Sequence, residues 1–339
     1  MISIRWVACF LLALMSDVAT AESVDDFYRG KQIRFLIRAA PGGNYDLYAR
    51  TLGRHMSRYI PGEPSVLPVN MPGAGGLTAL HYLDKTLPHD GTAMTIVTQT
   101  TALDQSLGLD PNLKTDISSL NWLGNISDEN FFLVSRRDSQ TKLLVDSRQR
   151  ETIIGGTGTG GVEVTVVYVM NAVLGTRFKP ILGYQSGPAM TLAMARGEIE
   201  SRATTNLRSL FATTPQGAEA FNVLVQFGLR KDPNYPNIPL ATEFAETNEK
   251  RAALVLLSKV ISLSRPVATQ QNVPATRVAA LRAAFDATMR DPEFIDEAKR
   301  QDLDVSPWTG QEVKKIIDEI IQAPEITKVL VRSALQKAP

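Results

Sequence analysis

A glycine-rich turn recurs three times in this sequence, and it limits the possible folds more than any other feature. Each turn follows a short apolar run and precedes a helical pattern. The turns lie at residues 41–43, 72–76 and 155–161, after predicted strands at 33–37, 65–70 and 152–154. Strands that alternate with helices are typical of parallel sheets covered by helices on both faces. We therefore predict an α/β protein.

The order of the elements predicts two lobes rather than one continuous sheet. A length of 339 residues fits about two domains of roughly 150 residues each. Residues 122–135 carry two apolar clusters around a polar middle, as expected for a strand that leaves one lobe and enters another. The β-rich run 221–227 offers a return path. The predicted first lobe comprises residues 22–125 and 228–339, the second comprises residues 126–227, and a ligand would bind between them.

The N-terminal 21 residues have the features of a secretory signal peptide. Arg5 precedes an uncharged apolar run at 6–15, and Ala19-Thr20-Ala21 fits a small-residue cleavage site. The run is shorter than the roughly 20 residues that span a bilayer, although an N-terminal membrane anchor is the alternative. The single cysteine, Cys9, would be removed with the peptide. A secreted mature chain would then have neither a thiolate metal site nor a disulfide.

Charge and histidine content argue against several other functions. The formal net charge is +1, and no run of lysine and arginine exceeds two residues, so the basic surface of a nucleic-acid-binding protein is missing. The histidines are His55, His81 and His89, and their spacing does not match a metal-ligand motif. We therefore predict no metal, no cofactor and no nucleic-acid partner.

The glycine-rich turns are chemically suited to bind an anion. The first amide groups of a helix are unpaired and carry a partial positive charge, and glycine lets a ligand approach the backbone. A single turn of this kind is more often a simple connection between a strand and a helix. Two such turns in the first lobe and one in the second predict a site that grips both ends of a dicarboxylate.

Two enzyme functions are kept as alternatives. Gly156-x-Gly158-x-x-Gly161 matches a dinucleotide-binding motif, but residues 172–183 lack the acid that binds the ribose. Arg177 would suit the 2′-phosphate of NADP instead, which leaves an NADP-dependent oxidoreductase open. The Gly-x-Ser-x-Gly motif of many hydrolases is absent from the sequence. Because catalytic triads assemble in space, a secreted hydrolase is also left open.

Around the three turns, the sequence resembles the Bug family, the periplasmic solute receptors of tripartite tricarboxylate transporters. The similarity runs from about Phe27 to about Ile321. It is carried by Pro41-Gly42-Gly43 with Asp46 and Arg50, Asn70-x-Pro72-Gly73-Ala74-Gly75-Gly76, Asp90-Gly91-Thr92, Gly158-Thr159-Gly160, Gly183-Tyr184-x-x-Gly187-Pro188-Ala189 with Gly197, Arg230 with Pro236-Asn237-Ile238-Pro239, and Pro274 with Asp291-Pro292-Glu293.

The resemblance implies a type II periplasmic-binding-protein fold with hinged lobes and no enzymatic activity. The ligand would be a small organic acid, such as a di- or tricarboxylate, an aromatic acid or an amino acid. The partners would be the membrane subunits of a tripartite tricarboxylate transporter, with a sensor protein as the alternative. We expect the receptor to be a monomer.

The resemblance also implies which residues bind the ligand. Main-chain amides and waters at the first two turns would hold the carboxylate, and the second lobe would close the site. The residues at these positions are Gly42, Gly43, Asp46, Gly73, Ala74 and Gly75 in the first lobe, and Gly158, Thr159, Tyr184 and Ser186 in the second. Asp46 would act through water or by capping its helix, because a direct contact between two carboxylates is repulsive.

Two residues depart from the family pattern at the predicted site. Arg38 would either pair with a ligand carboxylate or form a salt bridge on the lobe surface. Tyr45 would either stack on an aromatic ligand or narrow the cleft. Both departures leave the identity of the ligand open.

Overall fold

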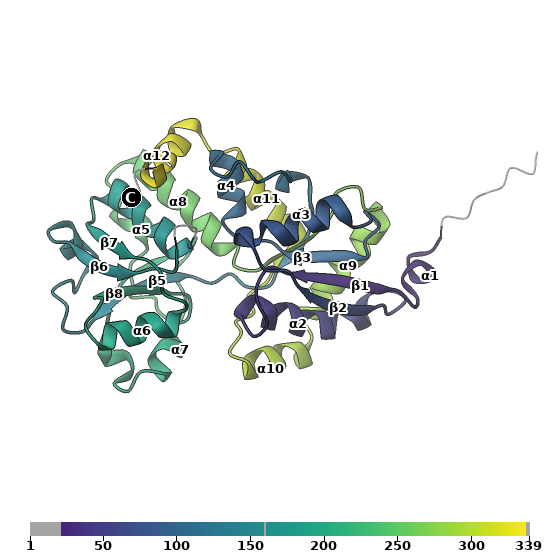
Figure 1. Cartoon of the computed structure of the whole chain (residues 1–339), viewed down its shortest axis with the longest axis horizontal. Coiled ribbons are helices and arrows are strands. Elements are labelled where there is room, and N and C mark those ends of the chain that lie inside the picture. The colour runs from purple at the N-terminus through teal and green to yellow at the C-terminus, as the bar shows by residue number, and fades with distance from the viewer. Residues whose placement is uncertain (1–21, 159–160, 337–339) are drawn as a thin grey trace, which may run out of the picture.

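The computed structural model describes residues 22–158 and 161–336. The predicted signal peptide at 1–21 and the predicted ligand residue Thr159 lie outside the described residues. Within the described part, no helix combines the length and the apolar character that crossing a membrane requires. The described chain forms two sheets, and helices cover each of them (Figure 1). Each sheet with its covering helices is called a lobe below.

The first sheet has six strands in the order β11-β4-β10-β3-β1-β2. They are β1 (Gln32–Ile37), β2 (Ser65–Asn70), β3 (Ala93–Ile96), β4 (Asn121–Asn125), β10 (Pro266–Thr269) and β11 (Trp308–Thr309). Strands β1, β2 and β3 are parallel, as predicted. β10 runs antiparallel to β3 and β4, because it enters this sheet from the side of the second lobe.

The second sheet has five strands in the order β7-β6-β8-β5-β9. They are β5 (Phe131–Arg136), β6 (Thr152–Gly155), β7 (Phe178–Ile181), β8 (Ser201–Thr204) and β9 (Phe221–Phe227). Strand β6 is parallel to β7 and β8, whereas β5 is antiparallel to β8 and β9. Both sheets therefore combine three parallel strands with an antiparallel part at the side where the chain crosses between lobes.

Amphipathic helices bury the first sheet. One face is covered by α2 (Asn44–Met56), α9 (Ala275–Thr288) and α10 (Pro292–Arg300), and the other by α3 (Leu77–Thr86), α4 (Thr101–Leu107) and α11 (Gly310–Ile321); the short α1 (Val24–Tyr28) lies at the far edge. Tyr48, Leu52 and Met56 recur every four residues on α2, so they share one face. All three are buried against Phe35 and Phe285 in one apolar cluster.

The helices of the second sheet divide in the same way (Figure 1). α5 (Val162–Leu174) packs with α8 (Asn248–Ser262) and α12 (Glu325–Gln336) on one face. α6 (Gly187–Ala195) and α7 (Leu207–Ala212) cover the opposite face.

Three segments connect the lobes, and the last of them is the short link between α11 and α12. Residues 126–130 join β4 to β5, close to the break predicted within 122–135. The chain then stays in the second sheet through β9 and enters the first sheet again only at β10, after α8. Because α8 and α12 lie against α5, part of the segment 228–339 also covers the second sheet. The division into residues 22–125 with 228–339 and residues 126–227 stays a prediction.

Candidate functional site

The two glycine-rich turns of the first lobe lie side by side because they follow adjacent parallel strands. β1 and β2 pair in register up to Ile37 and Asn70, and the Met71 amide donates to the Ile37 carbonyl at 2.7 Å. The carboxyl ends of parallel strands meet at one edge of a sheet. The turns at 41–43 and 72–76 therefore share an edge, and that edge points toward the second lobe (Figure 1).

Asp46 ties the two turns together from inside the first lobe. Its buried carboxylate accepts hydrogen bonds from the Gly42 amide, Arg50 Nε and Asn70 Nδ2, each at 2.8 Å. Asn70 Nδ2 also donates to the Ala39 carbonyl at 2.8 Å. Burial alone would raise the pKa of Asp46, but these hydrogen bonds and the charge of Arg50 hold the pKa below its usual value. Asp46 therefore positions the turns, and both of its oxygens are already engaged.

The second turn has an unusual backbone. Gly73, Ala74, Gly75 and Gly76 have successive positive φ angles of 137°, 45°, 63° and 107°. Glycine adopts such angles at little cost, whereas Ala74 is strained there. Gly73, Ala74 and Gly75 are exposed. The turn leads directly into α3, so its backbone is presented at the start of a helix.

The Arg38 side chain is hydrogen-bonded to the backbone of the second turn. Its Nη2 donates to the Gly75 carbonyl at 3.0 Å, and Thr98 Oγ1 donates to the same carbonyl at 2.8 Å. The Arg38 guanidinium also lies over the Tyr45 ring at 4.5 Å, and the buried Arg265 lies at 4.7 Å from that ring centroid. Cations so close to an aromatic ring are attracted by its π-electrons. Tyr45 thus has two guanidinium neighbours that hold it in place.

Arg38 forms no ion pair with an acid in the described part of the chain. The buried acid of the neighbouring turn, Asp46, pairs with Arg50 instead. Arg38 Nε is buried and has no hydrogen-bond partner there. A salt bridge on the lobe surface, one of the two predicted roles, is therefore not what holds this side chain. Contact with a ligand stays a prediction for both Arg38 and Tyr45.

The described ligand residues predicted in the second lobe lie just before helices. The carbonyl of half-buried Gly158 accepts the Gly161 amide at 2.9 Å before α5 begins. Ser186 is the N-cap of α6, where its Oγ accepts the Ala189 amide at 3.4 Å. Tyr184 is half-buried against the apolar cluster beneath α6 and α7. These contacts fix the starts of the helices, which is where the anion was predicted to bind.

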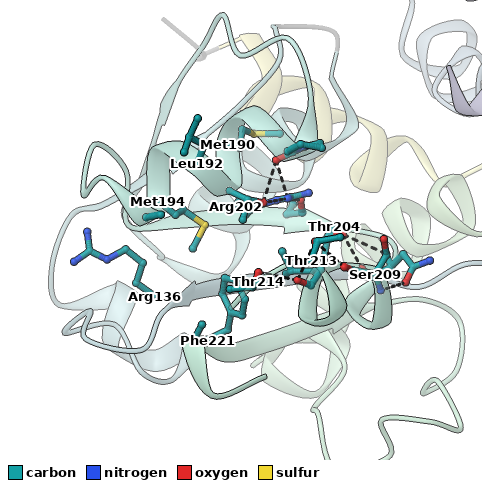
Figure 2. Close-up of a pocket in the computed structure, with 18 of the residues that line it drawn as sticks. Arg136, Met190, Leu192, Met194, Arg202, Thr204, Ser209, Thr213, Thr214 and Phe221 are labelled. Atoms are coloured by element: carbon teal, nitrogen blue, oxygen red, sulfur yellow. Dashed lines mark hydrogen bonds between the residues drawn. The ribbon is translucent and has the colours of Figure 1, made fainter. Parts of the chain in front are cut away.

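A cavity of about 1340 Å³ opens between α6 and α7 in the second lobe (Figure 2). Its lining mixes apolar and hydroxyl side chains and includes Met190, Leu192, Met194, Phe221, Thr204, Ser209, Thr213 and Thr214. Asn44, the first residue of α2, also lines the cavity, so the cavity extends to the start of a first-lobe helix.

The cavity adjoins the predicted site without containing it. None of the predicted ligand residues in the described part of the chain belongs to the cavity lining. However, Asn44, Thr157 and Gly187 do line it, and each is the immediate neighbour in sequence of a predicted residue. The first-lobe turn at 41–43 and the second-lobe turns before α5 and α6 are therefore each adjacent in sequence to a residue of the cavity lining.

Sequence reasoning missed Arg202, a buried cation that lines this cavity together with the more exposed Arg136 and Arg137. Arg202 belongs to β8 and is only 8% exposed. Its Nη1 donates to the Gly187 carbonyl at 2.8 Å and to Thr191 Oγ1, and its Nε donates to the Ala203 carbonyl at 3.1 Å. Burial lowers the pKa of Arg202 to about 10, while the negative charge of Glu163 raises it. Arg202 thus remains protonated at neutral pH.

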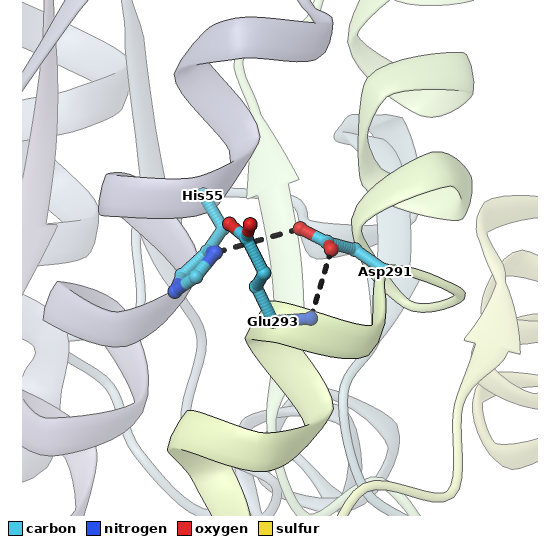
Figure 3. A group of neighbouring side chains, drawn as sticks. All are labelled: His55, Asp291 and Glu293. Carbon is cyan, nitrogen blue, oxygen red and sulfur yellow. Dashed lines mark hydrogen bonds and ion pairs between the residues drawn. The ribbon is translucent and has the colours of Figure 1, made fainter.

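One cluster of side chains has the composition of a metal site but not its chemistry. His55, Asp291 and Glu293 lie together at the contact between α2 and α10 (Figure 3). Arg58 forms ion pairs with both Asp291 and Glu293, and His55 Nε2 lies 2.6 Å from Glu297 Oε2. Because these acids are already paired with cations, the cluster is an ion-pair network that fastens α10 to α2.

The other histidines also make contacts away from the cavity. The Lys114 amide donates to His81 Nε2 at 3.2 Å. His89 lies within 2.9 Å of two backbone carbonyls, those of Gln271 and Asp84. Within the described residues, no hydrogen bond joins a histidine to a serine hydroxyl.

Comparison with known families gives one match across most of the chain. A family model described as the tripartite tricarboxylate transporter family receptor matches residues 49–330. A curated relative is a UPF0065 protein from the TAR-I ttuE-ttuC′ intergenic region of Agrobacterium vitis. It is 29% identical over 214 residues, which cover 60% of this chain and 59% of the relative.

Solved structures of the same type cover nearly the whole fold. A TctC solute-binding protein from Polaromonas has a TM-score of 0.69 at 16% identity, over 90% of this chain and 99% of that protein. The periplasmic binding protein BugD has a TM-score of 0.63 at 15% identity, over 89% and 97%. Rpa4515 of R. palustris, solved with adipate, has a TM-score of 0.64 at 16% identity, over 89% and 97%. These likenesses confirm the predicted two-lobed α/β fold.

Proposed function

The chain belongs to the tripartite tricarboxylate transporter receptor family, and from that premise we propose that it captures a small organic carboxylate for the membrane subunits of such a transporter. The predicted resemblance to this family is confirmed. The receptor would act in the periplasm, after removal of residues 1–21, and as a monomer. No covalent step is part of this function: the ligand would be bound and released unchanged.

One observation carries the proposal. The turns at 41–43 and 72–76 start two helices at neighbouring positions of one sheet edge, and three residues of the second turn are exposed. A carboxylate placed there would meet backbone amides and the positive ends of α2 and α3 together. The Asp46 network holds the turns in this arrangement before any ligand arrives. Little ordering is then required on binding, which favours affinity.

The predicted ligand residues take two kinds of role in this proposal. Gly43, Gly73, Ala74 and Gly75 would present backbone to the carboxylate, while Gly42 and Asp46 would shape the first turn. Gly158, Thr159, Tyr184 and Ser186 would approach from the second lobe as the lobes close. Arg38 and Tyr45 would support the turns, and Arg38 would also attract the anion.

A ligand screen with the mature chain tests the proposal. Thermal unfolding is followed with a panel of mono-, di- and tricarboxylates, aromatic acids and amino acids, and hits are measured by calorimetry. At least one carboxylate should raise the unfolding temperature, because a ligand that binds only the folded state stabilises it. Hydrolysis of a generic ester that is lost on changing one serine would contradict the receptor function.

The variant Gly75→Asp tests whether the turn at 72–76 binds the carboxylate. Gly75 has a φ of 63° with no heavy atom near its missing Cβ, a conformation that Asp tolerates. The new carboxylate would repel the ligand at a helix start, so we expect affinity to fall at least about 100-fold. Gly75→Asn adds similar bulk without charge and should cost less. Gly108→Asp is a matched control with the same φ at the end of α4. Equal affinities for Gly75→Asp and Gly108→Asp would exclude this turn.

A further inference from the structure

Arg202 is a buried charge without an acidic partner in contact with it. It lines the cavity together with Met190, Met194, Leu210 and Phe221, which belong to one apolar cluster. Within the described residues its hydrogen bonds go to two carbonyls and one hydroxyl, all neutral acceptors. Buried charges in proteins are normally paired, because an unpaired one loses its hydration without compensation.

The nearest acid is committed elsewhere. The Glu163 carboxylate lines the same cavity, but its Oε1 accepts both the Thr157 amide at 2.7 Å and the Thr157 hydroxyl. Glu163 therefore braces the turn before α5 and influences Arg202 only at a distance. The cavity's other acids, Asp138 and Glu219, are exposed. A counter-ion that reaches Arg202 would have to enter the cavity.

The cavity connects this cation to the proposed carboxylate site. Asn44 at the start of α2 and Arg202 on β8 line one continuous space. A ligand whose first carboxylate lies at the turn at 41–43 would have to pass Asn44 to bring a second acidic group to Arg202 through this space. The apolar side chains of α6 and the residues facing them would contact the part of that molecule between or beside its charges (Figure 2).

We propose that the ligand is an organic diacid with an apolar body, and that Arg202 binds its second acidic group in the cavity between α6 and α7. This inference rests on the proposed function, in which the first-lobe turns bind the first carboxylate. The Gly187 carbonyl and Thr191 hydroxyl hold Nη1, which fixes the direction of the guanidinium. Arg202 is thus a specificity-determining residue: it distinguishes diacids from monoacids, while the turns bind either.

Calorimetry with matched pairs of acids tests this on the wild-type mature chain. The probes are the straight-chain diacids from succinate to sebacate, each compared with the monoacid of equal length. A second ionic contact should make the best diacid bind roughly 10- to 100-fold more tightly than its monoacid. Affinity should also rise a few-fold per added methylene until the cavity is filled. A diacid preference of less than threefold, or affinity highest for succinate, would overturn the proposal.

Variants then assign the preference to Arg202. Arg202→Met should abolish the diacid preference and leave monoacid affinity unchanged, and Arg202→Lys should retain part of it. Arg196→Met removes an exposed arginine of the same lobe that does not line the cavity. It should change neither the diacid preference nor the monoacid affinity. Should Arg202→Met fail to fold, Thr191→Val takes its place: it removes one of the two acceptors that hold Nη1 and should reduce the preference several-fold.

The possible results separate this inference from the proposed function. Monoacids that bind the wild type but not Gly75→Asp, without any preference for diacids, would keep the carboxylate site and remove the role of Arg202. Failure of every acid to bind would remove both. A diacid preference that persists in Arg202→Met would place the second acidic group elsewhere and overturn the assignment.

Discussion

The turns of the first lobe present backbone groups, whereas the cavity of the second lobe is lined by side chains. At the first-lobe turns, backbone groups face outward, and a buried network around Asp46 holds them rigid. In the second lobe, side chains surround an open space, and the buried cation Arg202 lines it. Backbone amides recognise the carboxylate that all candidate ligands share. Side chains can differ between relatives without disturbing the fold, so selectivity is expected to lie in the second lobe.

The difference has a consequence for stability. Every charge of the Asp46 network has a partner, so removing Asp46 leaves the charge of Arg50 without its acidic partner. Arg202 has no charged partner in contact, so removing it relieves an unfavourable burial. Asp46→Ala and Arg202→Met test this contrast, and Asp304→Asn, near the segment that joins the lobes, adds a buried acid for comparison; they follow from the largest expected effect to the smallest.

Asp46→Ala should be the most damaging. It leaves Arg50 Nε and the Gly42 amide without their acceptor and removes one of the two acceptors of Asn70 Nδ2, so we expect a loss of about 2–4 kcal/mol in the free energy of unfolding at pH 7. Because the folded-state pKa of Asp46 is lowered, its stabilisation is present above about pH 4 and disappears as the pH falls further. Urea denaturation at pH 7 and pH 3 measures both effects. A loss below about 1 kcal/mol at pH 7 would contradict the rigid-turn description.

Asp304→Asn should act in the opposite direction, near the segment that joins the lobes. Burial, together with the nearby charge of Glu129, raises the pKa of Asp304 to about 6. A carboxyl whose folded-state pKa is raised loses stability as the pH rises from about 4 to above 6. The neutral amide avoids this loss, so the variant should gain about 1–2 kcal/mol at pH 7 and nothing at pH 4. Equal effects at both values would show that charge is not the cause.

Arg202→Met should have the smallest effect on stability. The substitution removes three hydrogen bonds but also removes an unpaired buried charge beside an apolar cluster. We expect the free energy of unfolding to change by no more than about 1 kcal/mol in either direction. Urea denaturation without ligand makes the measurement. A loss above about 2 kcal/mol in the free energy of unfolding would mean that Arg202 stabilises the fold. It would contradict the expected difference between Arg202 and the Asp46 network.

Features encoded in neighbouring residues were predictable from the sequence. The turns at 41–43, 72–76 and 155–161 combine a preceding strand, glycine and a following helix, all within one short stretch. The crossing near 122–135 was visible for the same reason, since its polar middle interrupts two apolar runs. These local patterns were enough to predict the two-lobed α/β fold.

Features that depend on distant contacts were not predictable. β8 was missed because Ser201, Arg202 and Thr204 are polar, although all are buried on a strand. Its burial arises from α5, α6 and the neighbouring strands β5 and β6, none of which is indicated by the sequence pattern of residues 201–204. The two guanidiniums beside Tyr45 come from Arg38 and Arg265, far apart in the chain. Neither contact leaves a local pattern.

The most direct test of a ligand held between backbone turns and a buried arginine is a crystal structure of the mature chain with its tightest-binding diacid. One carboxylate should lie against the turns at 41–43 and 72–76, and the other should contact the Arg202 guanidinium in the cavity between α6 and α7. A ligand that is bound without touching either turn, or a cavity that closes upon its own apolar side chains when the acid binds, would contradict the account.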